Sequence, residues 1–221
     1  MVRFTSLVIL EIAIMATVLF SSEEVIAQST YPKSQFGIRV GGNANSWTNE
    51  FPALEFEDDL IYPDSWKVHF GGHLGAYINI RLSQLVALEP GVFYSQKGTS
   101  TTLDLSGIDF EGTIKSNYLD LPLLLRLYPA GGFNIFMGVQ FAYHLNSSFD
   151  FEVDGNPVID GEDTTDTISE FDVAPVLGIG YEFEGGFNLN LAGELGMISV
   201  DGIGNLDTFN RNIRLSIGYA F

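Results

Sequence analysis

Apolar and polar residues alternate along the stretch from Trp66 to Ile80. One parity holds Trp66, Val68, Phe70, Gly72, Leu74, Ala76, Ile78 and Ile80, and the other holds Lys67, His69, Gly71, His73, Gly75, Tyr77 and Asn79. Side chains of a β-strand point alternately to its two faces, so this pattern predicts a strand with one apolar and one polar face.

Eight segments of the chain show this alternation, and each is long enough to cross a membrane as a tilted strand. They cover residues 35–46, 66–81, 85–98, 113–128, 133–146, 170–183, 187–198 and 209–221. An even number of strands with one apolar face is typical of a barrel whose outside meets lipid. We therefore predict an all-β fold, an eight-stranded antiparallel up-and-down transmembrane β-barrel.

Aromatic residues gather near the ends of these segments, where amphipathic rings favour the level of the lipid headgroups. They are Trp66, Tyr94, Tyr128, Phe133, Tyr181, Phe187 and Tyr219. We expect them to form two girdles around the barrel.

The connections between the segments alternate in length. Residues 82–84, 130–132 and 184–186 make tight turns, whereas 47–65, 99–112, 147–169 and 199–208 make long links. Outer-membrane barrels place short turns in the periplasm and long loops outside the cell. We therefore predict short periplasmic turns, long extracellular loops and periplasmic termini.

A soluble lipocalin-like barrel is the structural alternative, since it also has eight strands. Its apolar residues would point inward around a ligand. The apolar faces of this chain carry nearly unbroken large side chains, and the interior of eight strands has room for few of them. The number of large apolar side chains exceeds what the interior could hold, and this favours the membrane barrel.

The first 27 residues resemble a secretory signal peptide. Arg3 precedes a mostly apolar stretch from Phe4 to Phe20, and Ala27 ends a run suited to signal-peptidase cleavage. Glu11 interrupts the apolar stretch, and a membrane-spanning helix is the alternative. We predict a signal peptide over residues 1–27 and one barrel domain over residues 28–221.

Charge and composition exclude several kinds of partner and site. The formal net charge of −18 argues against nucleic acid and anionic headgroups as direct partners, while cations and basic partners stay open. The chain has no cysteine, which excludes disulfides, thiolate nucleophiles and cysteine metal sites. No cofactor is expected.

The polar face of the strands carries charges of both signs, which should pair inside the lumen because an isolated buried ion is costly. The expected network consists of Arg39, Arg81, Glu89, Asp120, Arg126, Glu182, Glu194 and Arg214. In a narrow barrel it would act as a plug. An ion path or a catalytic carboxylate pair is the alternative.

The three histidines do not indicate a metal site or a catalytic site. His69, His73 and His144 share the inward parity, but a spacing of four in a strand separates His69 from His73 by more than about 10 Å. One metal ion therefore cannot bind both. No Ser/His/Asp spacing indicates a hydrolase, and no catalytic residue is predicted.

The four long links hold 18 acidic residues and no lysine or arginine. One of them contains a group of possible oxygen ligands for a hard cation such as calcium, although the spacing does not match an EF-hand. The group is Asp154, Asp160, Glu162, Asp163 and Asp166. The simpler explanation is that these acidic residues keep a surface loop solvated.

Three stretches carry a resemblance to a known family: LEPGVFYSQKG at 88–98, YLDLPLLLRLYP at 118–129 and the closing IRLSIGYAF. They resemble the PorT-like outer-membrane β-barrel domain family of Bacteroidetes-type bacteria. The resemblance implies an outer-membrane barrel, and the namesake is implicated in protein secretion through a type IX apparatus. Tyr219 and Phe221 resemble the terminal signal that the barrel assembly machinery reads.

The sequence thus predicts a non-enzymatic protein of the outer membrane, in contact with its lipid, that serves an envelope or secretion assembly in a structural or accessory role. An envelope or secretion protein is the expected partner. A small transporter or pore and a lipid A-modifying enzyme are the alternatives.

Overall fold

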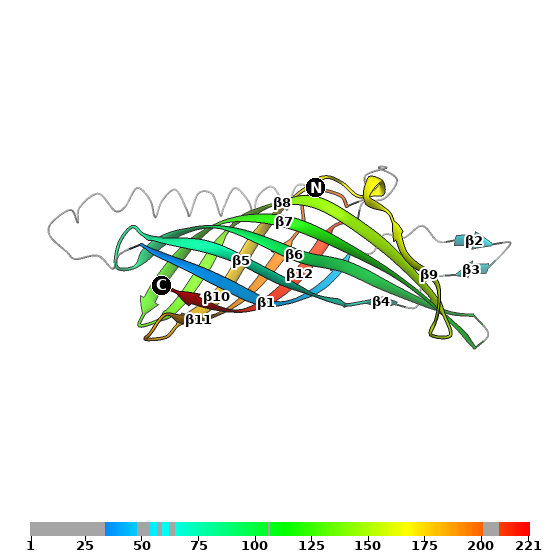
Figure 1. Ribbon diagram of the computed structural model, residues 1–221, viewed down its shortest axis with the longest axis horizontal. Coiled ribbons are helices and arrows are strands. Elements are labelled where there is room, and N and C mark those ends of the chain that lie inside the picture. Colours follow the sequence, from blue (N-terminus) through cyan, green and yellow to red (C-terminus); the bar gives the residue numbers. More distant parts are fainter. Residues whose placement is uncertain (1–33, 48–53, 57–58, 62–64, 106, 201–207) are drawn as a thin grey trace.

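Eight antiparallel strands form a closed ring in a computed structural model of the chain, which describes residues 34–47, 54–56, 59–61, 65–105, 107–200 and 208–221. The ring strands are β1 (Gln35–Trp47), β5 (His69–Arg81), β6 (Val86–Leu105), β7 (Ile108–Ala130), β8 (Phe133–Val153), β10 (Phe171–Glu182), β11 (Phe187–Leu195) and β12 (Asn210–Ala220). The predicted all-β, up-and-down barrel is confirmed (Figure 1).

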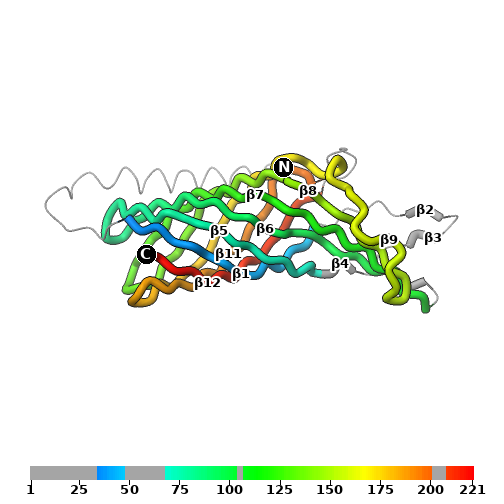
Figure 2. Tube along the Cα trace, in the orientation of Figure 1, coloured from blue at the N-terminus to red at the C-terminus, as the bar shows by residue number. Residues whose placement is uncertain are grey.

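Neighbours in sequence are neighbours in the ring, including β8 and β10, which pair directly. The first and last strands, β1 and β12, pair with each other and close the ring (Figure 2). The short strand β9 (Asn156–Asp163) adds to β8 beyond the ring, and β4 (Ser65–Lys67) adds to β6. β2 (Leu54–Phe56) and β3 (Asp59–Ile61) pair only with each other among the described strands. The described residues contain no helix long and apolar enough to cross a membrane.

Three tight connections lie at one end of the barrel together with the C-terminus (Figure 1). They join β5 to β6, β7 to β8 and β10 to β11. Gly131, Gly185 and Gly186 adopt positive φ in two of these turns, a conformation that side-chain-bearing residues seldom reach. The predicted pattern of short turns is therefore confirmed, and the predicted signal peptide lies outside the described residues.

The outer face of the ring is apolar and exposed. Large side chains such as Leu74, Ile213 and Leu215 are more than half exposed. Apolar residues and Tyr219 fill this parity of β5 and β12 as far as Arg211, which lies at the end of β12 away from the tight turns, so the face suits contact with lipid acyl chains.

Two aromatic levels bound this apolar band. Phe133 lies opposite Tyr181 at the level of the tight turns, and Tyr143 lies opposite Phe171 at the other level, with ring centroids 5.1 Å apart. Ten residue steps of about 3.3 Å on strands tilted by about 40° separate the levels by about 25 Å. This height matches the apolar band of outer-membrane barrels.

One predicted girdle residue lies elsewhere. Tyr128 is buried inside the ring, where its hydroxyl accepts a hydrogen bond from Asn79 at 3.0 Å. Its parity on β7 is that of Arg126, so the alternation of the strand turns the ring inward. The side chain of Trp66 lies outside the described residues.

Strands β6, β7 and β8 continue well past the barrel, which corrects the prediction of long loops at 99–112 and 147–169. Together with β9 they form a sheet, here called the projecting sheet, made of residues 99–105, 108–117, 146–153 and 156–163. It extends beyond the end opposite the tight turns (Figure 1). These segments form regularly paired strands although they are rich in threonine, serine and acidic residues.

Candidate functional site

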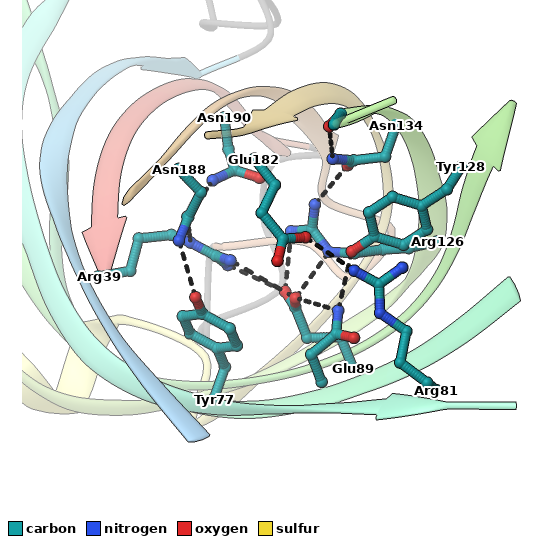
Figure 3. A network of polar contacts seen from close by, with 12 residues as sticks. Arg39, Tyr77, Arg81, Glu89, Arg126, Tyr128, Asn134, Glu182, Asn188 and Asn190 are labelled. Carbon is teal, nitrogen blue, oxygen red and sulfur yellow. Dashed lines mark hydrogen bonds and ion pairs between the residues drawn. The ribbon is translucent and has the colours of Figure 1, made fainter. Parts of the chain in front are cut away.

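Glu89 is the centre of an ion cluster inside the barrel, near the tight turns (Figure 3). Its carboxylate accepts hydrogen bonds from Arg39 Nη1 at 2.9 Å, Arg126 Nη2 at 2.8 Å and Asn79 Nδ2 at 3.3 Å. Arg126 Nε lies 2.7 Å from the second carboxylate oxygen. Glu89 is 2% exposed, so two guanidinium groups neutralise a carboxylate that water scarcely reaches.

Aromatic rings complete this first cluster. The guanidinium of Arg39 lies 3.9 Å from the ring centroid of Tyr77, and that of Arg81 lies 3.6 Å from the ring of Tyr128. Arg81 also donates to Glu182 at 2.8 Å. The rings therefore hold the arginine side chains flat while the carboxylates bind their ends.

A second ion cluster lies farther from the tight turns. Lys97 contacts Asp120 at 3.0 Å, and Arg214 contacts Glu194 at 2.5 Å. Gln140 bridges the second pair, since it accepts a hydrogen bond from Arg214 at 2.7 Å and donates one to Glu194 at 3.2 Å. Every charge in this cluster has a partner of opposite sign.

An apolar cluster of Leu124, Phe136 and Val176 lies between the two ion clusters. The guanidinium of Arg126 packs 4.3 Å from the Phe136 ring on one side, and Val176 is in register with Glu194 on the other. Large side chains thus fill the lumen at mid-height.

Glycines on neighbouring strands make room for the inward rings. In each case a ring lies directly opposite a glycine in register, and an added Cβ would come within 2.6 Å of it. The pairs are Gly37–Tyr77, Gly41–His73, Gly75–Phe93 and Gly178–Phe136. The many inward glycines therefore serve packing and do not leave an open pore.

A recess remains beside the first ion cluster, lined by Arg39, Glu89, Arg126, Tyr128 and Glu182 among others. The centre of a water molecule can occupy a volume of about 10 Å³ in this recess. That is the room of about one water, far below that of a pocket for a small ligand.

The eight charged residues predicted to line the lumen all take part in these ion pairs. Lys97 also belongs to the network but was not predicted to, although its parity on β6 is that of Glu89. Amides and rings that were not predicted, among them Asn79, Gln140 and Tyr77, make further hydrogen bonds in the lumen.

The histidines sit in separate polar surroundings. His73 is hydrogen-bonded to Asn43 at 2.7 Å and to Ser216 at 2.8 Å, while His144 contacts Ser147 at 2.6 Å. In the described part of the chain, no three histidine or acidic side chains are grouped so as to hold a metal ion.

The acidic residues proposed as calcium ligands are spread over the outer part of the projecting sheet and the loop after it. Asp154 occupies the turn between β8 and β9, with positive φ, and its carboxylate accepts a hydrogen bond from the Asp109 amide. Asp163 accepts from Thr165 instead. Asp160, Glu162 and Asp166 do not join them in a metal-binding group. The calcium hypothesis stays a prediction.

One acidic residue of the projecting sheet has a basic partner. Lys115 lies 2.5 Å from Asp150 across the β7–β8 pair, and this hydrogen bond lowers the pKa of the Asp150 carboxyl below its ordinary value. Both side chains lie on the outer face of the sheet.

The two terminal aromatic residues lie on the apolar outside of the barrel. The rings of Tyr219 and Phe221 are 5.1 Å apart, Tyr219 also contacts Phe187, and Phe221 stacks on Phe36. This placement leaves the last strand with an aromatic outer edge, and its role as an assembly signal stays a prediction.

Comparison with known proteins identifies the fold. Residues 26–202 match the family described as outer membrane protein beta-barrel domain. No curated protein sequence matches the chain. Similar solved structures include Ail of Yersinia pestis, with 12% identity, a TM-score of 0.46 and coverage of 86% of this chain and 100% of Ail.

Two further solved structures are similar over the same share of the chain. Neisserial surface protein A has 9% identity, a TM-score of 0.48 and coverage of 86% of this chain and 100% of its own. OprG of Pseudomonas aeruginosa has 17% identity, a TM-score of 0.38 and coverage of 86% and 97%.

Proposed function

Because this chain belongs to the family of outer-membrane protein β-barrel domains, we propose that it is a non-enzymatic anchor with a structural or accessory role in an envelope or secretion assembly. The observation that carries the proposal is the contrast between its two parts. The lumen is filled by ion pairs and rings, while three strands continue beyond the barrel as a paired sheet. The projecting sheet is the working surface.

The motifs that resemble the PorT-like family of Bacteroidetes-type bacteria support this assignment through their place in the fold. LEPGVFYSQKG lies in β6 and supplies Glu89 and Lys97, while YLDLPLLLRLYP lies in β7 and supplies Asp120 and Arg126. These four residues take part in the two ion clusters. A secretion role follows by analogy with the family's namesake.

Orientation in the membrane is part of the proposal: a cleaved signal peptide, periplasmic termini and a projecting sheet outside the cell. The chain has no cysteine, so single cysteines report cleanly on accessibility. A membrane-impermeant maleimide should label Ser148→Cys, on the projecting sheet, in intact cells. The control Ser83→Cys, in a tight turn, should react only after lysis, and the reverse result would overturn the orientation.

The proposed role is tested by mild detergent extraction with an affinity tag after the predicted cleavage site. We expect a stoichiometric envelope or secretion protein to co-purify. A lone barrel under conditions that preserve other envelope complexes would contradict the accessory role.

A pore is the competing function that the filled lumen opposes. Purified protein in planar bilayers should show no steady single-channel conductance, and a stable conductance step would refute the closed lumen. Lipid A of expressing cells should keep its mass, since a change would indicate a lipid-modifying enzyme.

A further inference from the structure

In the projecting sheet, the polar and apolar faces are exchanged relative to those of the barrel strands that it continues. A bulge at Leu145 separates the pair Tyr118–His144 from the pair Asn117–Asn146, so β8 gains one residue and its parity changes. On β7 the inward parity continues without interruption from Tyr118 to Ile108. The face that lines a polar lumen inside the ring therefore becomes apolar beyond it.

Aromatic residues dominate this inner face of the projecting sheet. Ile114 lies opposite Phe149, and Phe110 lies opposite Val153. The ring of Phe151 is 6.2 Å from that of Phe110 and 6.3 Å from that of Phe149, both stacked. These side chains are only half-buried. A row of partly exposed phenylalanines outside a membrane indicates a binding surface.

Acidic residues lie along the β9 edge of this apolar face, and five others lie on the opposite face of the same sheet, namely Asp104, Asp109, Glu111, Asp150 and Glu152. Residues 99–117 and 146–169 hold ten aspartates and glutamates and a single basic residue, Lys115. Glu162 of the edge strand β9 lies opposite Phe149 in register. A lysine or arginine placed there would meet a carboxylate and an aromatic face together.

We propose that the inner face of the projecting sheet binds a basic amphipathic polypeptide segment, whose apolar side covers the phenylalanines and whose cations face the acidic β9 edge with Glu162. The inference rests on the proposed function and names the chemistry of its partner. Charge favours this occupant, since a second copy of the chain carries −18 and the 47–65 segment holds six acidic and no basic residues. Anionic lipid is disfavoured for the same reason.

The test uses the full chain in phosphatidylcholine nanodiscs and a fluorescein-labelled lysine–leucine peptide of amphipathic helical period. A glutamate–leucine peptide of the same pattern is the charge control, and empty nanodiscs give the background. Fluorescence anisotropy measures binding at increasing salt. We expect the basic peptide alone to bind, with an affinity that falls as salt rises.

Variants locate the binding face. Phe149→Ser with Phe151→Ser should weaken binding about tenfold or more, because it removes the central rings of the face. Glu162→Gln should weaken binding less and reduce its salt dependence. Thr113→Ser, on the outer face of the same sheet, should bind as the parent does. Heat-modifiable gel mobility verifies that each barrel is folded, and Phe149→Leu should retain most of the affinity.

Four results would overturn the inference. They are no binding of the basic peptide, equal binding of the acidic peptide, binding unchanged by the phenylalanine variant, and self-association that this variant abolishes. A co-purifying partner without peptide binding would leave the accessory role standing and refute the proposed chemistry. Peptide binding without any co-purifying partner would support the proposed chemistry and refute the accessory role.

Discussion

Removing the charge of Glu89 should be the most damaging single change in the lumen. Glu89→Gln keeps the size of the side chain but turns one carboxylate oxygen into an amide NH₂. Arg39 and Arg126 then face a donor where they now find an acceptor. The first ion cluster holds three arginines and two carboxylates, so its net charge rises from +1 to +2 in a site with little access to water.

The expected cost follows from the number of contacts that are lost. One carboxylate oxygen accepts from Arg39 Nη1 and Arg126 Nη2, and the other lies within 2.7 Å of Arg126 Nε and 3.3 Å of Asn79. Breaking a buried ion pair from one side costs about 3–5 kcal/mol, because the remaining charge stays buried. We expect a loss in this range.

Urea unfolding in detergent micelles, followed by heat-modifiable gel mobility, measures the loss. Glu182→Gln is the matched control, because Glu182 is more exposed and has Arg81 as its one ion-pair partner among the described residues, and it should cost about 1 kcal/mol. Adding Arg39→Met to Glu89→Gln returns the cluster to +1 and should recover part of the stability. A loss below about 1 kcal/mol for Glu89→Gln, or a double variant less stable than the single one, would refute the reasoning.

Further predictions concern the packing, the lipid face and the projecting sheet. Gly178→Ala would place a Cβ 2.2 Å from the Phe136 ring and should destabilise the barrel by about 1–3 kcal/mol in the same urea assay, with Phe136→Leu as a partial suppressor. Leu215→Arg, at a lipid-facing position that is 62% exposed, should cost about 2–4 kcal/mol in liposomes but much less in detergent; equal losses in both would argue against lipid contact. In a carbon-13 NMR titration, Asp150 should titrate below 3.8, and Lys115→Met should return it towards that value. Because the folded pKa is lowered, the pair contributes about 0.2–1 kcal/mol above roughly pH 4, and this contribution disappears as the pH falls through the lowered pKa.

The barrel could be predicted because alternation is a strong signal in strands that contact lipid on one side and water on the other. The same parity rule identified the charged residues of the lumen. It also indicated an inward Tyr128, since this residue shares its parity with Arg126, but the position near a strand end suggested a girdle instead. The specific pairs, such as Arg81 with Glu182, depend on the stagger of distant strands and could not be predicted.

The projecting sheet could not be predicted for a different reason. Residues 99–112 are rich in threonine, aspartate and glycine, which are typical of loops, and the apolar parity there belongs to the opposite face. The bulge at Leu145 shifts the pattern of β8 by one residue, so its extension is out of phase with the membrane strand. The pairing of rings with glycines likewise depends on register between strands.

The continuity of β6, β7 and β8 has a mechanical consequence. A loop yields to a pull at its tip by bending, whereas strands that run unbroken from the barrel wall pass the load along their hydrogen-bonded ladders. The projecting sheet spans about ten residues of β7, or about 30 Å. It therefore acts as a stiff extension of the barrel wall that holds its tip at a set height and direction above the membrane. A force applied at the tip is borne by the whole barrel.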